Sequence, residues 1–492
     1  MREKRQDDIR QAGAQGGAAK RIGMPKPSGL VSLSATEAVL RLRKGEISPR
    51  EMVEASIARI EAVDGAINAL PVRIFEQALD AAAAFKPDRE AAREPGWLGG
   101  LPVAIKEYND VRGQPTTFGS PIFANAIAGE SDLVVRNLET SGAIVIAKSN
   151  VPEFAGSNTF NPVYGATRNP WDLRMTAGGS SGGAAAALAS HQVWLANGSD
   201  LGGSLRIPAS YCGIAGMRPS VGRVPRPASL PAFDSLWVEG PMARTVADLA
   251  LMLQAQTRPS IHDALALPAP AVPFTQAIAR ATAPRRVGFT PNLGLARVVD
   301  GEVIAICSAA AQRLAGAGSV VEEACPDLSG SIETFQTLRA LLFASVRGDL
   351  LDEHRDRIAP EIVWNLQKGI DLTAGEIIEA ERLRARIFIA VAEFFDEFDI
   401  LACPTVALPP FPVEQRYPTE IGGEKLTTYI DWMFLTFCLT ITGCPVISLP
   451  CGLTQSGLPV GLQLMGKPRG EYELLSAAHV LEQLCGLKHP GD

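Results

Sequence analysis

The 492-residue chain has little positive charge, few aromatic side chains and few histidines. Its 46 Lys and Arg residues stand against 53 Asp and Glu, which gives a formal net charge of −7, and aromatic residues make up 6% of the chain. A surface that binds nucleic acid needs clustered Lys and Arg to neutralise phosphates, so no nucleic-acid partner is predicted. The five histidines all lie outside the glycine-rich segments, which argues against a serine nucleophile that depends on histidine.

Cysteine pairs and metal-ligand spacings are missing as well. The eight cysteines include no Cys-x-x-Cys pair and no Cys/His pattern, and the chain has neither a P-loop nor an H-x-x-E-H-like cluster. No metal site and no cofactor are therefore predicted. In a chain of this length, scattered cysteines fit buried thiols in a reducing compartment better than a disulfide framework, which predicts a cytoplasmic protein.

Long hydrophobic runs are also lacking. No segment reaches the roughly 18 consecutive apolar residues of a membrane span, and the first residues lack the apolar centre of a secretory signal. No membrane partner is expected. Residues 1–27, rich in Gly, Ala, Gln and charge, are predicted to be a flexible N-terminal arm.

Short apolar runs alternate with helix signals in the remainder of the chain. Residues 101–105 and 142–147 have the pattern of buried strands, and residues 132–138 between them have that of a capped helix. Such a strand–helix–strand unit favours parallel strand pairing. The same theme returns in a later set of segments: 286–289, 301–316, 319–322, 399–402 and 445–449. The pattern predicts the α/β class.

Local signals also fix some boundaries. Ser34-Ala-Thr-Glu37 is a capping box that predicts the start of a helix, and Ser48-Pro-Arg-Glu51 predicts the start of a second one. A Pro- and Ala-rich stretch, residues 258–284, is predicted to be a surface excursion.

A glycine-rich segment runs from Met175 to Gly183. It reads Met-Thr-Ala-Gly-Gly-Ser-Ser-Gly-Gly and precedes a run of alanines, so a turn leads directly into a helix. One interpretation is a loop whose backbone approaches a reacting group, with free N–H groups at the helix N-terminus. The other is a tight turn with a serine N-cap. The segment alone does not decide between them.

A second glycine-rich segment, Asn197 to Pro208, reads Asn-Gly-Ser-Asp-Leu-Gly-Gly-Ser-Leu-Arg-Ile-Pro. A serine preceded by two glycines lies where successive backbone N–H groups can converge on one oxygen, as in an oxyanion hole. The alternative is a bulge or turn with no chemical role. The predicted oxyanion donors are the N–H groups of Leu201, Gly202, Gly203 and Ser204.

Together these two segments resemble the signature of the amidase-signature family of serine hydrolases. The similarity continues in Tyr211-Cys-Gly-Ile-Ala-Gly-Met-Arg-Pro219 and upstream in Gly100-Leu-Pro-Val-Ala-Ile-Lys106, and it spans about residues 34–468. The resemblance implies one large domain, residues 28–492, with a signature core at about 95–225. It further implies a central, twisted, mixed β-sheet flanked by helices on both faces.

The resemblance implies a Ser-cisSer-Lys triad. Lys106, acting through Ser180, deprotonates Ser204, which attacks the substrate carbonyl and forms an acyl-enzyme. The Gly179–Ser180 peptide is expected to be cis. A lysine can serve as the base only if it is neutral, which requires burial, and Lys106 at the end of an apolar strand meets that need.

Three residues near the triad are predicted to support it. Asp200 and Arg206 flank the nucleophile and are expected to hold its loop by charge-assisted hydrogen bonds. Ser181 is interpreted either as a hydrogen-bond partner near Lys106 and Ser180 or as a simple N-cap.

The implied reaction is hydrolysis of the C–N acyl bond of a small-molecule amide, with anilides and carbamates included. Two alternatives remain: an esterase or carbamate hydrolase with the same triad, and the A-type subunit of a tRNA-dependent amidotransferase. In the amidotransferase branch, a Gln commonly follows the motif's Arg, whereas this chain has Ile207. A homodimer is the quaternary structure that the resemblance implies.

Gly179 and Phe154 are predicted to contact the substrate. Candidate pocket segments are residues 108–123, 154–160 and 431–437, whose aromatic residues would favour an aryl or hydrophobic acyl group. For the last segment, the alternative is that its aromatic side chains simply belong to the core.

Overall fold

The computed structural model describes residues 25–88 and 90–486. The predicted flexible arm lies outside these residues except for its last three, Pro25 to Pro27.

An eleven-stranded mixed sheet runs through the described part of the chain. In spatial order its strands are β1 (Val72–Arg73), β3 (Ile144–Ser149), β2 (Pro102–Lys106), β8 (Leu195–Asp200), β10 (Val238–Ala243), β9 (Ala215–Arg218), β16 (Val446–Leu453), β17 (Pro459–Gly466), β13 (Ile400–Pro404), β11 (Arg286–Phe289) and β12 (Val320–Glu323). Strands β3, β2 and β8 pair in parallel, as do β13, β11 and β12, and the other pairs are antiparallel. The predicted α/β class and mixed sheet are confirmed.

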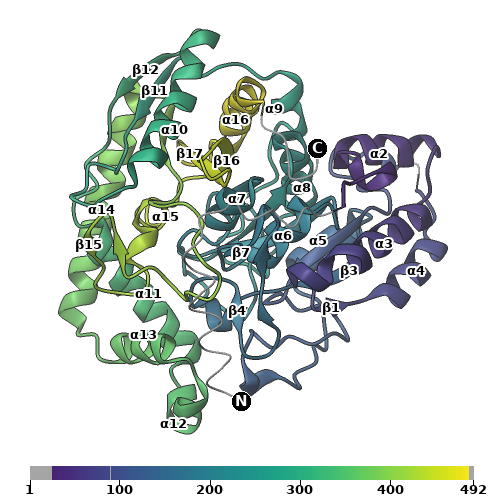
Figure 1. Ribbon diagram of the computed structural model, residues 1–492, viewed down its shortest axis with the longest axis horizontal. Coiled ribbons are helices and arrows are strands. Elements are labelled where there is room, and N and C mark those ends of the chain that lie inside the picture. Colours follow the sequence, from purple (N-terminus) through teal and green to yellow (C-terminus); the bar gives the residue numbers. More distant parts are fainter. Residues whose placement is uncertain (1–24, 89, 487–492) are drawn as a thin grey trace, which may run out of the picture.

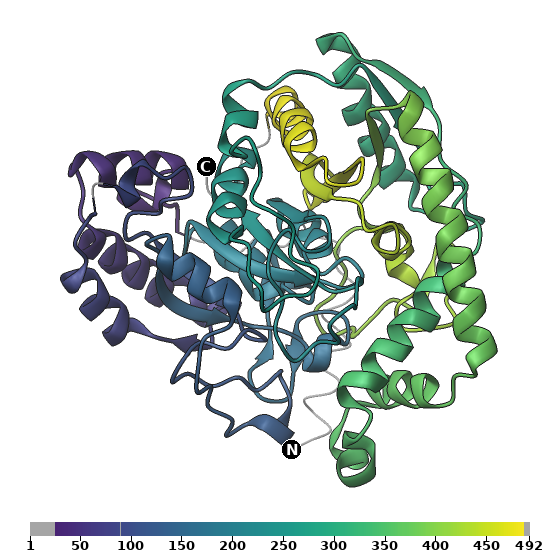
Figure 2. The same ribbon diagram turned by 180° about the vertical axis from the view of Figure 1, so that it is seen from behind.

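Helices surround this sheet (Figure 1). They are α2 (Ala35–Lys44), α3 (Pro49–Ile67), α4 (Phe75–Ala84), α5 (Leu133–Thr140), α6 (Gly182–Ala189), α7 (Arg206–Cys212), α8 (Val246–Gln256), α9 (Thr275–Ala279), α10 (Gly301–Arg313), α11 (Ser331–Arg347), α12 (Leu350–His354), α13 (Pro360–Ile370), α14 (Ala374–Glu397), α15 (Phe434–Thr440) and α16 (Glu471–Cys485). Figures 1 and 2 show α11 to α14 along one side of the molecule and α2 to α4 on the opposite side.

Two hydrophobic cores lie on opposite faces of the sheet. On β2, Val103 and Ile105 belong to one core, and Ala104, which points the other way, belongs to the second. The first core contains side chains of α5 and α8, and the second contains those of α3, α4 and α6. Because both faces are covered, β2 and β8 are buried along their whole length.

The local helix signals act as the sequence predicts. Ser48 and Glu51 form both bonds of a capping box at the start of α3, and the Ser34 side chain accepts the Glu37 N–H at the start of α2. Helix α2 ends at Gly45, which has φ of 70°.

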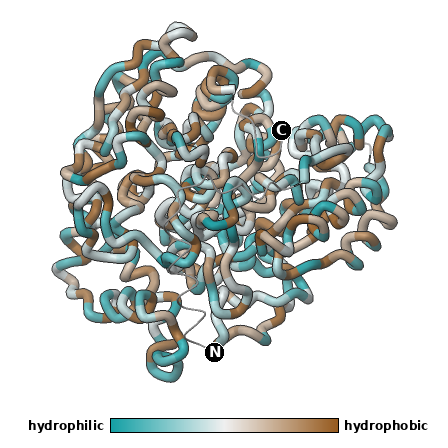
Figure 3. Tube along the Cα trace, viewed as in Figure 1, coloured by the Kyte–Doolittle hydropathy of each residue, from teal (hydrophilic) through white to brown (hydrophobic). Residues whose placement is uncertain are grey.

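The segment 258–284 contains only the short helix α9, and Phe274 and Ala277 are buried there. The outer helices α11 to α14 carry hydrophilic and hydrophobic residues in alternation (Figure 3), as expected for helices with one buried face. Among the described residues, no helix is long and apolar enough to cross a membrane.

Candidate active site

Lys106 lies at the C-terminal end of β2, and its side chain is fully buried. The backbone N–H of Lys106 donates to Asn197 Oδ1 at 2.7 Å, which fixes the end of β2 against β8. The Nζ atom of Lys106 lies 2.7 Å from Ser180 Oγ and 2.9 Å from Ser199 Oγ, and it also donates to the Ser199 carbonyl at 3.3 Å. The structure therefore joins the predicted base directly to the predicted relay serine.

The surroundings of Lys106 favour its neutral form. Burial lowers the pKa of the Lys106 ammonium, and the charges of Glu239 and Asp200 oppose that effect without cancelling it. The Tyr108 ring, whose centroid is 4.9 Å from Lys106 Nζ, covers another side of the amine. A neutral amine within hydrogen-bond distance of a hydroxyl can accept its proton.

The Gly179–Ser180 peptide is cis, as the resemblance to the amidase-signature family implies. Glycine is required at position 179 because a Cβ atom there would lie 2.2 Å from the carbonyl oxygen of Ser157. Thr159 Oγ1 donates to the Ser180 carbonyl at 3.4 Å, and the Thr159 N–H donates to the Gly178 carbonyl at 2.9 Å. The loop before α6 is thus held against residues 157–159.

Ser181 occupies the N-cap position of α6, but its hydroxyl makes no capping hydrogen bond to that helix. Instead, Ser181 Oγ donates to the Ser199 carbonyl at 3.4 Å, the same oxygen that Lys106 Nζ contacts. The Ser181 N–H donates to the Ser204 carbonyl at 3.2 Å. Ser181 therefore links the loop of the predicted nucleophile to the loop of the relay serine.

The loop from Asp200 to Leu205 joins β8 to α7. The Asp200 carboxylate accepts the N–H groups of Gly203 at 2.8 Å and Leu205 at 3.2 Å. The Gly203 N–H is thereby engaged, so an oxyanion would have to share this donor with Asp200. Thr436 Oγ1 donates to the Gly202 carbonyl at 2.7 Å and closes the loop from the other side.

Asp200 is fully buried between Arg206 and Arg218. Arg206 Nε lies 3.0 Å from Asp200 Oδ2, and one terminal nitrogen of Arg218 lies 3.3 Å from Oδ1. Burial opposes ionisation of Asp200, but the two guanidinium charges outweigh it and hold the pKa of the carboxyl well below its usual range. The predicted supporting role of Asp200 and Arg206 fits this geometry, and Arg218 is an additional member.

Glu239 on β10 is a buried carboxyl that the sequence reading missed. It is the cross-strand partner of Ser199 on β8, so both side chains lie on the same face of the sheet as neighbours. Trp237 Nε1 donates to Glu239 Oε1 at 2.8 Å, and burial raises the pKa of Glu239. Its sequence context, an acidic residue inside the apolar run from Leu236 to Ala243, is the signal that could have identified it.

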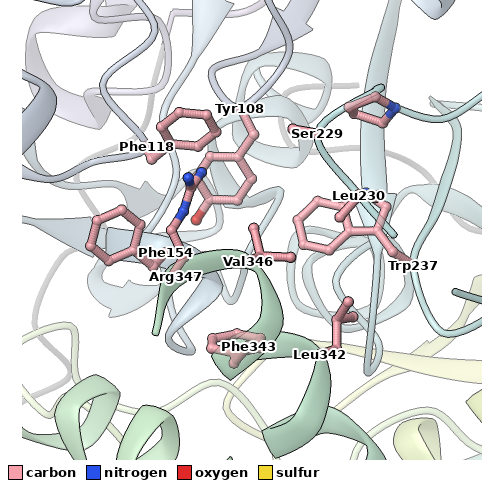
Figure 4. Close-up of a pocket in the computed structure, with 11 residues that line it drawn as sticks. Tyr108, Phe118, Phe154, Ser229, Leu230, Trp237, Leu342, Phe343, Val346 and Arg347 are labelled. Carbon is pink, nitrogen blue, oxygen red and sulfur yellow. The ribbon is translucent and has the colours of Figure 1, made fainter. Parts of the chain in front are cut away.

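A pocket bordered by Tyr108 lies near Lys106, and Figure 4 shows its side chains. Tyr108, whose ring contacts Lys106, forms one wall, and the predicted substrate-contact residue Phe154 lines the pocket as well. The remaining lining residues come mainly from the loop before β10 and from α11: Phe118, Pro227, Ser229, Leu230, Trp237, Leu342, Phe343, Val346 and Arg347.

The aromatic residues of 431–437 do not line this pocket. Trp432, Phe434 and Phe437 are 0%, 2% and 0% exposed, and Phe437 stacks on Phe335 with ring centroids 4.5 Å apart. The core alternative is therefore the correct one for this segment. Helix α11, for which the sequence offered no site signal, supplies the wall instead.

No group of three or more His, Cys, Asp or Glu side chains within residues 25–88 and 90–486 is arranged to hold a metal ion. The buried carboxyls near Lys106 have other partners: Glu239 interacts with Lys106 itself, and Asp200 forms ion pairs with Arg206 and Arg218.

The chain is similar to a known protein family, to curated proteins and to solved structures. The family model described as Amidase matches residues 51–475. An acylamidase of Rhodococcus erythropolis is 36% identical, over 91% of this chain and 94% of its own length. The A-type subunit of the glutamyl-tRNA(Gln) amidotransferase of Moorella thermoacetica is 34% identical, over 92% of this chain and 97% of its own length. Among solved structures, a bacterial aryl acylamidase of the amidase-signature enzymes aligns with a TM-score of 0.85 and 29% identity, over 92% of this chain and 96% of that one.

Proposed function

The chain belongs to the amidase family and is a hydrolase of carbon–nitrogen bonds in linear amides, and from that premise we propose how its site works and which amides it cleaves. Ser204 is the nucleophile, Ser180 the relay and Lys106 the base. The observation that carries this assignment is the 2.7 Å contact between the buried Lys106 amine and Ser180 Oγ.

The proposed reaction moves one proton through the triad in each direction. Lys106 accepts the Ser180 proton while Ser180 accepts that of Ser204, and Ser204 Oγ attacks the carbonyl carbon. When the tetrahedral intermediate collapses, the C–N bond breaks and the proton returns through Ser180 to the leaving nitrogen, because an amide leaves poorly as an anion. Water then attacks the acyl-enzyme, gives its proton to the relay, and releases the acid with Ser204 restored.

The proposed oxyanion donors are the N–H groups of Leu201, Gly202, Gly203 and Ser204. Leu201 is 4% exposed, so charge that develops on the carbonyl oxygen would be stabilised with little competition from water. Asp200 anchors this loop through Gly203 and Leu205, so its ion pairs with Arg206 and Arg218 act by positioning the donors.

The proposed substrates are small-molecule amides with an aryl or hydrophobic group, anilides and carbamates among them. The pocket supports this class because most of its lining is aromatic or aliphatic, with Tyr108, Phe118 and Phe154 on one side and Trp237 and Phe343 on the other. The similarity to an acylamidase and to an aryl acylamidase points the same way.

A second candidate is the A-type subunit of an amidotransferase, favoured by the 34% identity to one such chain. Ile207, where a Gln is common in those chains, counts against it. An esterase or carbamate hydrolase with the same triad differs only in the leaving group. Parallel assays distinguish the amidase, the amidotransferase subunit and the esterase or carbamate hydrolase. The substrates are glutamine and a set of anilides, carbamates and esters, with the anilides and esters sharing one acyl group.

The proposed setting is the cytoplasm, with the enzyme acting as a homodimer and without a cofactor. The eight cysteines form no disulfide, which supports a reducing compartment. Light scattering at several protein concentrations tests the dimer.

The function is tested by incubating the protein with a fluorophosphonate probe and measuring its intact mass. A single adduct, together with release of an aromatic amine from acylanilides, is the expected result. Folded protein that forms no adduct and hydrolyses no amide would contradict the proposal.

A further inference from the structure

Arg347, the last residue of α11, projects into the pocket and lies among aromatic rings. Its guanidinium carbon is 4.3 Å from the ring centroid of Phe118 and 5.5 Å from those of Phe123 and Phe154. Figure 4 shows the side chain beside Phe118, Phe154 and Tyr108. Ring faces attract a cation, but they do not accept the five N–H groups of a guanidinium at full strength.

No Asp or Glu among the described residues forms an ion pair with Arg347, and no carbonyl or hydroxyl there accepts a hydrogen bond from it. The side chain is half-buried, and this burial lowers the pKa of its guanidinium. Because an arginine stays protonated at neutral pH, Arg347 places a positive charge and N–H donors without acceptors in a largely apolar pocket.

Arg339, two turns earlier on α11, is an arginine of the same helix whose N–H groups do have hydrogen-bond acceptors. Its guanidinium carbon also lies over two rings, 4.2 Å from Phe343 and 5.4 Å from Tyr429. Unlike Arg347, it donates to Asn365 Oδ1 and, at 2.7 Å, to the Tyr429 hydroxyl. Arg339 is therefore a structural residue, whereas the donors of Arg347 face the pocket.

Arg347 lines the same pocket as Tyr108, the residue whose ring contacts the Lys106 amine. Tyr108 stacks on Phe118 with centroids 6.0 Å apart, and Tyr108 also contacts the Lys106 amine. Arg347 lies beyond Phe118, and both residues line the pocket that Tyr108 walls. Ser180 and Ser204 do not line this pocket, so a substrate group near Arg347 would have to lie several bonds from an amide that reacts at Ser204.

We propose that Arg347 binds an anionic group, most simply a carboxylate, on the substrate, so that this amidase prefers amides with an acidic group several bonds from the scissile C–N bond. This inference rests on the proposed function and narrows its substrate class. A carboxylate can accept two guanidinium N–H groups side by side, which a neutral aryl or alkyl group cannot do.

The first test compares acidic and neutral amides of the same shape. The mono-anilide of glutaric acid, whose second carboxyl is free, is paired with pentananilide and places the acid on the acyl side. The compound 4-acetamidobenzoate is paired with 4-methylacetanilide and places the acid on the amine side. The released amine is measured by chromatography, and kcat/KM is obtained for each substrate. The decisive quantity is the acid-to-neutral ratio within a pair, because a general loss of activity cancels in it.

We expect the ratio to fall at least about ten-fold in Arg347→Met for at least one pair, and to recover partly in Arg347→Lys, which keeps the charge but not the paired donors. Arg355→Met is the matched control, since Arg355 is exposed, bonds Gln367 and does not line the pocket. That variant should leave both ratios unchanged. If both ratios in Arg347→Met stay within two-fold of those of the parent protein, the inference is overturned.

A binding measurement separates this inference from the proposed function. Calorimetry with the Ser204→Ala protein needs no turnover, and the two acidic amides serve as ligands. Weaker binding of at least one of them after Arg347→Met is added supports the anion site even if the parent protein hydrolyses neither amide. Binding that is equal in both backgrounds, or absent in both, overturns it, whereas hydrolysis of the neutral anilides upholds the proposed function alone.

Discussion

Lys106 Nζ lies 2.7 Å from Ser180 Oγ, and this pair connects two elements that are far apart in the sequence. The amine comes from the end of a buried strand, and the hydroxyl comes from the loop that enters α6. Because the Ser181 backbone is bonded to that of Ser204, the same two elements also fix the loop of the proposed nucleophile. The site is thus formed where β2, β8 and the start of α6 meet.

The Ser204 hydroxyl should be the group that a fluorophosphonate modifies. Substitution Ser204→Ala is expected to abolish the adduct and to lower kcat by at least about 10³-fold, because no other group replaces the attacking oxygen. Intact-mass spectrometry and anilide turnover measure the two effects. Ser229→Ala is the matched control, since Ser229 is an exposed serine that lines the same pocket. An adduct that disappears in Ser229→Ala instead would move the nucleophile to the pocket wall.

Two buried lysines allow chemistry to be separated from stability. Lys106→Met should lower kcat by at least about 10³-fold and should also lower the melting temperature, because it leaves the buried hydroxyls of Ser180 and Ser199 without the amine that they contact at 2.7 and 2.9 Å. Lys148 is also buried and donates to Thr116 Oγ1 at 2.7 Å and to the Pro115 carbonyl. Lys148→Met should therefore lower the melting temperature and affect kcat far less. Similar kinetic losses in the two variants would contradict the assignment of Lys106 as the base.

The elements with strong local signals could be predicted from the sequence. Strand β2 and helix α10 follow from their apolar patterns, and α3 follows from a capping box that the structure confirms. The centre of the sheet could not be predicted in this way. Strand β8 contains Asn-Gly-Ser-Asp and β10 contains Gly240-Pro241, which usually interrupt strands. Glycine occurs there because a Cβ atom at position 240 would lie 2.4 Å from the Met217 carbonyl oxygen.

The residues of the candidate site also divide into those with a local sequence signal and those that only the fold brings together. Ser180 and Ser204 stand in glycine-rich segments and Lys106 at the end of an apolar run, patterns that a single sequence displays. In contrast, Glu239 and Ser199 become neighbours only through the register of β8 against β10. The proposed role of Arg347 has no local sequence signal either, because it depends on which side chains of the folded protein bond to its guanidinium. Pairings across strands and between distant helices are what the sequence pattern does not contain.

Activity should fall as the pH is lowered, because the base must be neutral and a falling pH protonates Lys106. The negative charge of Glu239 raises the pKa of Lys106, so Glu239→Gln removes an effect that favours the protonated amine. The acid limb of the kcat/KM profile should then move to lower pH, by about 1 unit. Glu107→Gln is the control, since Glu107 interacts with Lys148 rather than Lys106. A limb that moves to higher pH, or moves equally in both variants, would show that Glu239 does not act on Lys106.

The ion pairs of Asp200 should matter to stability much more than those at the surface. Asp200→Asn leaves two buried guanidinium charges without a counter-ion and is expected to cost about 3–5 kcal/mol of unfolding free energy, measured by urea denaturation. Glu322→Gln is the comparison, because the Arg286–Glu322 pair is 38% and 43% exposed and should contribute less than about 1 kcal/mol. Equal losses in the two variants would mean that the Asp200 cluster is not what holds the nucleophile loop.

Gly203 should tolerate no side chain. It has φ of 122°, and a Cβ atom there would lie 2.3 Å from Thr436 Oγ1, so Gly203→Ala must displace the loop that carries the proposed oxyanion donors. We expect kcat to fall about 10²–10³-fold, the size of effect known for loss of an oxyanion donor, with a smaller change in KM. Gly65→Ala is the matched control, because Gly65 lies inside α3 with open space around it. That variant should unfold at a slightly higher urea concentration, since alanine favours a helix by roughly 0.5–1 kcal/mol over glycine, and should retain full turnover. If Gly203→Ala instead lowers stability but leaves kcat intact, then the loop between Asp200 and Ser204 holds the fold together without setting the geometry of the reaction.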